Sequence, residues 1–159
     1  MAAADTTLLR HALATLAYRS RKVLADVPEG FAAFRPSADS RSAAEILAHM
    51  GDLFDWALTL AEDRQEWHNA QPLPWNDESA RFYAALQKFD DRLAASTELK
   101  SSCLSLFQGP VADALTHLGQ IAMLRRLAQA PTRGENYFKA EILVGRIDPA
   151  TQVAPRREF

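Results

Sequence analysis

The chain has 159 residues, of which 48% are hydrophobic and 24% are charged, and its formal net charge is −2 at pH 7. This length suits one domain over residues 1–159, and the composition excludes a disordered, collagen-like or membrane-spanning chain. No apolar run approaches the ~20 residues that cross a bilayer, and the basic residues are scattered among acidic ones, so we expect neither a membrane nor a nucleic acid as partner. Cys103 is the single cysteine and makes no internal disulfide, and the start of the chain lacks a secretory pattern, so we expect a cytoplasmic protein.

Two helices are predicted in the first half of the chain. Apolar residues at spacings of three and four indicate a first helix from about Asp5 to Asp26, which ends before Pro28 and Gly30. A second helix should begin at Ser42, because Ser42 and Glu45 have the spacing of a capping box. We expect this helix to continue to about Trp67.

Two more helices are predicted in the second half. Asp77 is the expected N-cap of the third helix, whose apolar face carries Phe82, Leu86, Phe89 and Leu93. After the poorly defined stretch 97–108, Gly109 and Pro110 should open a fourth helix that ends before Pro131. Four helices of roughly twenty residues with short connections indicate an all-α fold, a four-helix bundle, with a short C-terminal extension.

Polar residues interrupt the apolar faces of the second and fourth helices. At 100° per residue, His49 falls inside the apolar stripe of the second helix. On the fourth helix, Asp113, His117 and Gln120 interrupt an otherwise apolar stripe. Asp113 and His117 are four residues apart, so their Cβ atoms should lie only about 5–6 Å apart. We therefore expect a carboxylate and two imidazoles to point towards the core.

Three arrangements would compensate a buried carboxylate, whose charge is otherwise strongly disfavoured. The first is a structural hydrogen-bonded pair between Asp113 and His117 or His49. The second is a divalent metal bound by His49, Asp113 and His117, because two imidazoles and a carboxylate are a normal ligand set for a catalytic metal. The third is a metal-free acid–base pair in which the aspartate orients a histidine. The third ranks last, because no serine has the setting of a nucleophile.

Three phrases of the sequence resemble the DinB-like superfamily, also called DinB/YfiT-like metalloenzymes, over nearly the whole chain. They are EILAHMGDLFDWAL around His49, DALTHLGQIAMLRRL around His117, and the tail GENYFKAEILVGRI. The resemblance implies a four-helix bundle with a metal bound by a histidine of the second helix and by two residues one turn apart on the fourth. His49 and His117 match this pattern, whereas Asp113 stands where the family commonly has histidine. A carboxylate is a harder ligand, which shifts the expected metal from Zn or Ni towards Fe or Mn.

The resemblance also implies an activity. Some DinB-like proteins are similar to thiol S-transferases, which add a low-molecular-weight thiol such as bacillithiol, mycothiol or glutathione to an electrophile, and others are similar to isomerases or hydrolases. We therefore expect a divalent-metal-dependent transferase or hydrolase that acts on a small electrophilic substrate. The alternative is a non-catalytic helical bundle, structural or ligand-binding, with a degenerate metal site.

Three further residues are candidates for binding a substrate or cofactor. Gln120 is expected either to hydrogen-bond a polar neighbour, as the support of a metal ligand or as the cap of a buried polar group, or to contact the substrate. The tail is expected to seal one end of the bundle as a short helix or hook. Alternatively, Tyr137 or Lys139 of this tail would reach the open metal face and hold the substrate.

Other polar and apolar residues are expected away from the metal. Asp52 should lie at a solvated helix margin, and Arg125 and Arg126 should be solvated or part of an interface. Leu115, Leu118 and Ala122 form an apolar stripe opposite the ligand face of the fourth helix. Either a second copy of the chain, in a homodimer, or the tail would cover this stripe.

Overall fold

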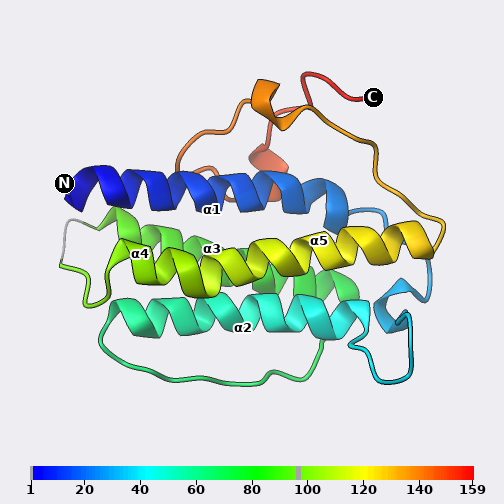
Figure 1. The fold of residues 1–159 in the computed structure, drawn as a ribbon, viewed down its shortest axis with the longest axis horizontal. Coiled ribbons are helices and arrows are strands. Elements are labelled where there is room, and N and C mark those ends of the chain that lie inside the picture. The colour runs from blue at the N-terminus through cyan, green and yellow to red at the C-terminus, as the bar shows by residue number, and fades with distance from the viewer. Residues whose placement is uncertain (1, 96–97) are drawn as a thin grey trace.

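The computed structural model describes residues 2–95 and 98–159 and consists of four long helices that pack together (Figure 1). They are α1 (Ala2–Leu24), α2 (Ala43–Ala61), α3 (Trp75–Ala94) and a continuous helical run formed by α4 (Cys103–Leu106), a π-helical turn (Phe107–Val111) and α5 (Ala112–Leu127). Short 3-10 turns occupy Phe31–Ala33, Tyr137–Lys139 and Pro149–Thr151. These ranges contain no strand, only an isolated bridge between Glu135 and Glu158. The predicted all-α, four-helix fold is confirmed.

The helices do not simply alternate in direction. α1 and α5 run one way and α2 and α3 the other, so the segment 62–74 joins two parallel helices by passing back along α2 (Figure 1). Helices α2 and α3 pack most extensively, and α2 also packs against α5. No helix in the described ranges is both long and apolar enough to cross a bilayer.

The core lies where the four helices meet. Its fully buried side chains come from every helix and include Leu13, Leu16, Leu47, Met50, Phe54, Phe82, Leu86, Phe89, Leu106 and Ile121. Phe54 of α2 contacts both Phe82 and Phe89 of α3, with ring centroids 5.9 and 6.2 Å apart. Large aromatic side chains thus supply much of the apolar area that holds α2 against α3.

The predicted start of α2 is confirmed, but its predicted end at Trp67 is wrong. Ser42 and Glu45 form the capping box, because each side chain accepts a hydrogen bond from the backbone N–H of the other. The helix ends at Ala61 because Asp63 adopts a left-handed conformation, with φ of 62°. The N–H groups of Asp63 and Arg64 then bond back to the last turn of the helix, which satisfies carbonyls that would otherwise lack partners.

The third helix begins two residues before the predicted N-cap. Pro74 is the N-cap residue, and Asp77 lies inside the first turn. Proline suits this entry because helix starts tolerate a residue without an N–H group. Asp77 still favours the helix, because a negative charge in the first turn complements the helix dipole.

The fourth helix also begins earlier than predicted, at Cys103 in place of Gly109. The Ser102 hydroxyl accepts a hydrogen bond from the N–H of Ser105 and caps α4. Pro110 then lies inside the helical run, within the π-helical turn. A proline lacks the N–H donor and clashes with the preceding turn, and the wider π turn accommodates it. The helix ends at Leu127, before Pro131 as predicted.

The C-terminal tail forms no α-helix and lies against α1 (Figure 1). The Tyr18 hydroxyl donates to Oε1 of Glu135 at 2.6 Å, and Lys22 contacts both Glu135 and Glu158. Burial and the adjacent Glu135 raise the pKa of Tyr18, because both disfavour a phenolate. The tail thus forms no α-helix, and side-chain hydrogen bonds and ion pairs to α1 fix its position.

Two helical glycines differ in the space that a side chain would find. A Cβ at Gly119 in α5 would meet nothing within 4 Å, whereas one at Gly51 in α2 would lie 2.7 Å from Nη2 of Arg81. Alanine is favoured over glycine inside helices by about 0.8–1.0 kcal/mol. We expect Gly119→Ala to raise the free energy of unfolding by about 1 kcal/mol, and Gly51→Ala to lower it because carboxylates hold Arg81 in place. Urea unfolding measures both changes. A higher free energy of unfolding in Gly51→Ala would contradict this interpretation.

Candidate metal centre

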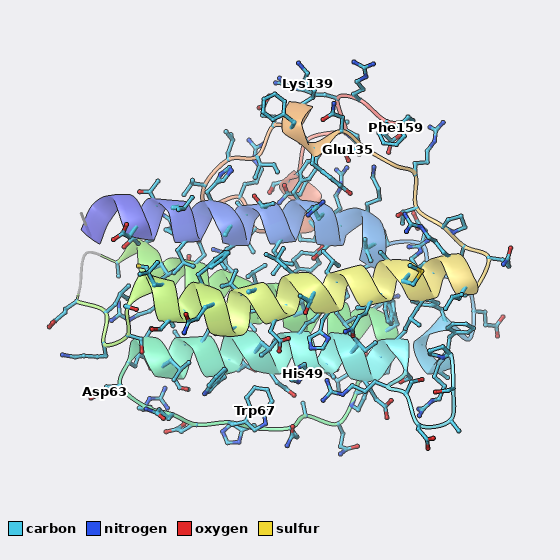
Figure 2. The ribbon with its side chains drawn as sticks, viewed as in Figure 1. His49, Asp63, Trp67, Glu135, Lys139 and Phe159 are labelled. Atoms are coloured by element: carbon cyan, nitrogen blue, oxygen red, sulfur yellow. The ribbon has the colours of Figure 1, made fainter. Side chains whose placement is uncertain are left out.

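Helices α2 and α5 bring three predicted ligands together. His49 of α2 faces Asp113 and His117 of α5, and one ligand atom from each residue lies within 4.8 Å of the other two. Nε2 of His49 is 3.5 Å from Oδ2 of Asp113, and Nε2 of His117 is 3.4 Å from Oδ1 of the same carboxylate. Figure 2 shows His49 on α2 beside α5. The packing of α2 on α5 thus creates the group.

Part of the spacing of these atoms matches the distances between the ligands of a metal ion. A tetrahedral ion with bonds of about 2.0–2.2 Å holds its ligand atoms about 3.3–3.6 Å apart. Both contacts of Asp113 fall in this range, and both exceed the ~3.2 Å upper limit of an ordinary hydrogen bond. The donor types, two imidazole nitrogens and a carboxylate, also fit a divalent cation. The two contacts of Asp113 run through different carboxylate oxygens, however, and separations within the group reach 4.8 Å, so the three residues form a candidate metal-binding group whose ligand atoms would move closer together around an ion.

Gln120 fixes the orientation of one ligand. Its Oε1 lies 2.9 Å from Nδ1 of His117. An amide oxygen only accepts hydrogen bonds, so Nδ1 carries the proton and the lone pair of Nε2 points towards Asp113. Partners of this kind set the tautomer of metal-binding histidines. Of the two expected roles of Gln120, the structure supports contact with a polar neighbour.

The surroundings of His49 favour its neutral form. Burial lowers the pKa of His49, and the positive charge of Arg41 and the nearness of His117 lower it further, while the hydrogen bond and charge of Asp113 oppose them. Neutral imidazole is the form that binds metals, because the nitrogen lone pair must be free. His49 is therefore prepared to act as a ligand near neutral pH.

The group lies at the rim of the core and not inside it, which corrects the predicted depth. The side chain of Asp113 is 46% exposed, and those of His49 and His117 are 17% and 12% exposed. Leu47 and Met50, which lie close to His49 on α2, are by contrast fully buried. Asp113 thus remains partly hydrated. Its charge does not need a metal ion as compensation for burial.

A tryptophan covers one member of the group, and a second tryptophan packs against it. Trp67, in the segment 62–74, contacts the ring of His49 edge to face, with centroids 5.4 Å apart. It also contacts Trp56 of α2, at 5.7 Å, and it lies outside α2 beside His49 in Figure 2. Because α2 was predicted to include Trp67, its position over the ligands was missed. The Trp67 indole thus covers one side of the His49 ring.

Two cavities open beside the group. One of about 220 Å³ lies next to His49 and is polar, lined by Arg41, Glu45, Asp52, Asn69, Ala70, Gln71 and Pro72. The other, of about 420 Å³, lies next to Asp113 and is lined by Leu53, Trp56, Gln108, Gly109, Ala112 and Thr116. The π-helical turn supplies Gly109 to the second cavity. The group is therefore open to solvent on two sides.

The structure does not bring Tyr137 and Lys139 to this group. The Tyr137 ring packs against Tyr18 of α1 and under the guanidinium of Arg19. Lys139 lies on the tail, at the opposite edge of the molecule from His49 (Figure 2). Tyr137 and Lys139 therefore do not lie where they could bind a substrate at the candidate metal centre, because the tail runs along α1 and not along α2.

The chain is thus an all-α protein of four packed helices with a candidate metal-binding group formed by His49, Asp113 and His117. Its resemblance to DinB-like proteins rests on the quoted sequence phrases and on this arrangement. Comparison of the chain with models of protein families, with curated proteins and with solved structures found no match.

Proposed function

We propose that the protein is a divalent-metal-dependent enzyme of the DinB-like type, a thiol S-transferase or hydrolase that acts on a small electrophile. The observation that supports this most is the convergence of His49, Asp113 and His117 within 4.8 Å. Zn, Ni, Fe and Mn are the candidate metals, and the carboxylate favours the last two. A divalent cation with three protein ligands supplies Lewis-acid activation of a water or a thiol at neutral pH.

The residues around the group suit two reactants. Arg41 places a positive charge in the polar cavity beside His49, where it would attract the carboxylates that thiols such as glutathione carry. The cavity beside Asp113 has apolar walls, including Leu53 and Trp56, and would accept the body of an electrophile. Trp67 would exclude water from one side of His49. With an epoxide as the electrophile, the thiol sulfur bonds to a ring carbon and the bond from that carbon to the epoxide oxygen breaks. The thiol proton goes to that oxygen.

Metal content tests the proposal directly. We expect protein purified without an affinity tag and supplied with Mn, Fe, Ni or Zn to bind about one ion per chain, since one three-ligand group is present. Asp113→Asn and His117→Ala should abolish uptake while the helical circular dichroism persists, because these side chains lie at the rim. A metal ion present at 100 times its Kd should stabilise the native protein by about 2.7 kcal/mol. A thermal-shift assay detects this increase.

Matched controls and an activity assay complete the test. Asp39→Asn and His11→Ala change the same residue types at exposed positions outside the group, and they should leave uptake unchanged. Loaded protein is then incubated with glutathione and an epoxide, and with the epoxide alone, which separates thiol transfer from hydrolysis. No uptake of any of the four metals, with both site variants unfolding, would instead identify a structural hydrogen-bonded network in a non-catalytic bundle.

A further inference from the structure

Another cavity lies on the other side of α5, between α1, α5 and the tail. We call it the tail pocket; it measures about 370 Å³ and is lined by Arg19, Val23, Leu115, Leu118, Gly119, Ala122, Arg126, Thr132, Arg133, Gly134, Glu135, Tyr137 and Phe159. Its volume falls at the lower end of the ~300–1,000 Å³ that is typical of small-molecule sites. The metal centre shares none of these residues.

Part of the floor and walls of the tail pocket is apolar and aromatic. Leu115, Leu118 and Ala122 of α5 face it, so the tail lies over the stripe predicted to be covered by the tail or by a second copy. The rings of Tyr137 and Phe159 stand on the tail side, and Figure 2 shows Phe159 near Glu135 on the tail above α1. Gly119 adds space, because no atom lies within 4 Å of the position its Cβ would take. The walls therefore suit a flat apolar body.

The charges around the tail pocket leave two arginines uncompensated. Glu135 is neutralised by Lys22, at 2.9 Å, and Arg133 lies 3.5 Å from Glu158. In the described part of the chain, no carboxylate lies within 4.0 Å of Arg19 or Arg126, and both line the pocket. Arg19 is held over the Tyr137 ring, with its guanidinium carbon 4.1 Å from the ring centroid. Two guanidinium groups, that of Arg126 exposed, thus line the pocket without an ion-pair partner within 4.0 Å, since the one carboxylate of the lining, Glu135, is paired with Lys22.

We propose that the tail pocket binds a small aromatic carboxylate, whose ring lies between the α5 side chains and the tail aromatics and whose carboxylate is bound by Arg19 and Arg126. A guanidinium binds a carboxylate through two parallel hydrogen bonds, which makes arginine the preferred residue for this ligand. Cationic ring contacts such as that of Arg19 keep the guanidinium in place without neutralising its charge. The tail, attached to α1 through Glu135, closes the pocket.

Titration with 1-naphthoate tests this inference, with 1-naphthamide as the neutral ligand of the same shape. We expect saturable binding of the acid by calorimetry and about tenfold weaker binding of the amide, since a charge-assisted hydrogen bond contributes about 1.4 kcal/mol or more. Arg19→Gln and Arg126→Gln should each weaken binding of the acid about tenfold and leave binding of the amide unchanged. Lys88→Gln removes the same single positive charge at an exposed position of α3. It should not change the binding of either ligand.

Two further measurements locate the ligand and separate this site from the metal centre. The amide signals of Gly119 and Gly134 should shift on addition of 1-naphthoate, and that of Gly51 should not. Gly119→Leu should fill the pocket and abolish binding. Chelation of metal, or Asp113→Asn, should leave binding unchanged, so this inference and the proposed function fail independently. Equal affinity for acid and amide, equal losses in Lys88→Gln and Arg126→Gln, or no saturable binding would overturn the inference.

Discussion

Replacing Arg81 with methionine is expected to lower the free energy of unfolding by about 3–5 kcal/mol, the cost of leaving buried charges without a partner. Arg81 of α3 donates to Oε1 of Glu78 at 2.6 Å and to Oδ1 of Asp52 at 3.0 Å. The side chain of Glu78 is fully buried and that of Asp52 is 6% exposed. Burial opposes the charge of Arg81, but the hydrogen bond and charge of Glu78 and the charge of Asp52 raise its pKa. Urea unfolding followed by circular dichroism measures the loss.

Two further variants identify the cause of that loss. Adding Glu78→Gln to Arg81→Met should recover part of the stability, because it removes one of the uncompensated charges. Arg64→Met removes an arginine whose two carboxylate partners are exposed and should change stability little. If Arg81→Met unfolds at the same urea concentration as Arg64→Met, the buried ion pairs do not stabilise the fold.

The same network reaches the metal centre. Asp52 was expected at a solvated margin, which is wrong, because Arg81 and the backbone N–H of Ala70 both bind its carboxylate. Ala70 belongs to the segment 62–74, which places Trp67 against His49. Arg81 therefore helps to position the cover of the candidate metal centre without contacting the ligands.

Replacing Arg125 with methionine is expected to lower the free energy of unfolding by about 2–4 kcal/mol, because four carbonyl groups, that of Val23 buried and the others partly buried, would lose a charged donor. The Arg125 guanidinium donates to the carbonyls of Val23, Ala25 and Asp26 at the end of α1 and to that of Ala130 after α5. The last carbonyls of a helix have no partner within it, and a positive charge there also complements the helix dipole. Thermal unfolding measures the change.

Arg126 offers the matched control for that prediction. It follows Arg125 directly in α5 but is exposed, so Arg126→Met should change the unfolding free energy little. Hydrogen exchange provides a local readout, since Arg125→Met should speed exchange in the last turn of α1. Equal thermal stability of the two variants would show that these carbonyls do not need Arg125.

Local signals predicted the helices well and their ends only in part. Local signals act over a few residues, and three of them predicted the helices correctly: the periodic apolar residues, the Ser42–Glu45 capping box and Pro131. The end of α2 depends on the left-handed conformation of Asp63, which aspartate tolerates but does not require. Pro110 is a strong signal for a helix start, yet the π-helical turn allows the helix to pass through it.

The candidate ligands were also predictable, whereas their surroundings were not. The four-residue spacing of Asp113 and His117 puts both on one face of α5, and the resemblance to DinB-like proteins paired that face with His49. The depth of the group was overestimated because a helical wheel shows which residues share a face but not how far the helix rotates towards its neighbour. The cover by Trp67 depends on the path of segment 62–74.

The amino-acid sequence by itself determined the four amphipathic helices, the cap of α2 and the polar residues on α2 and α5, because these follow from contacts between residues close in the chain. Only the tertiary structure decided that Arg125, and not the adjacent Arg126, is buried, because its acceptors on α1 lie about one hundred positions earlier. The tail pocket likewise needs α1, α5 and the tail together. Such features depend on how helices rotate and pack against distant segments, which local patterns do not encode.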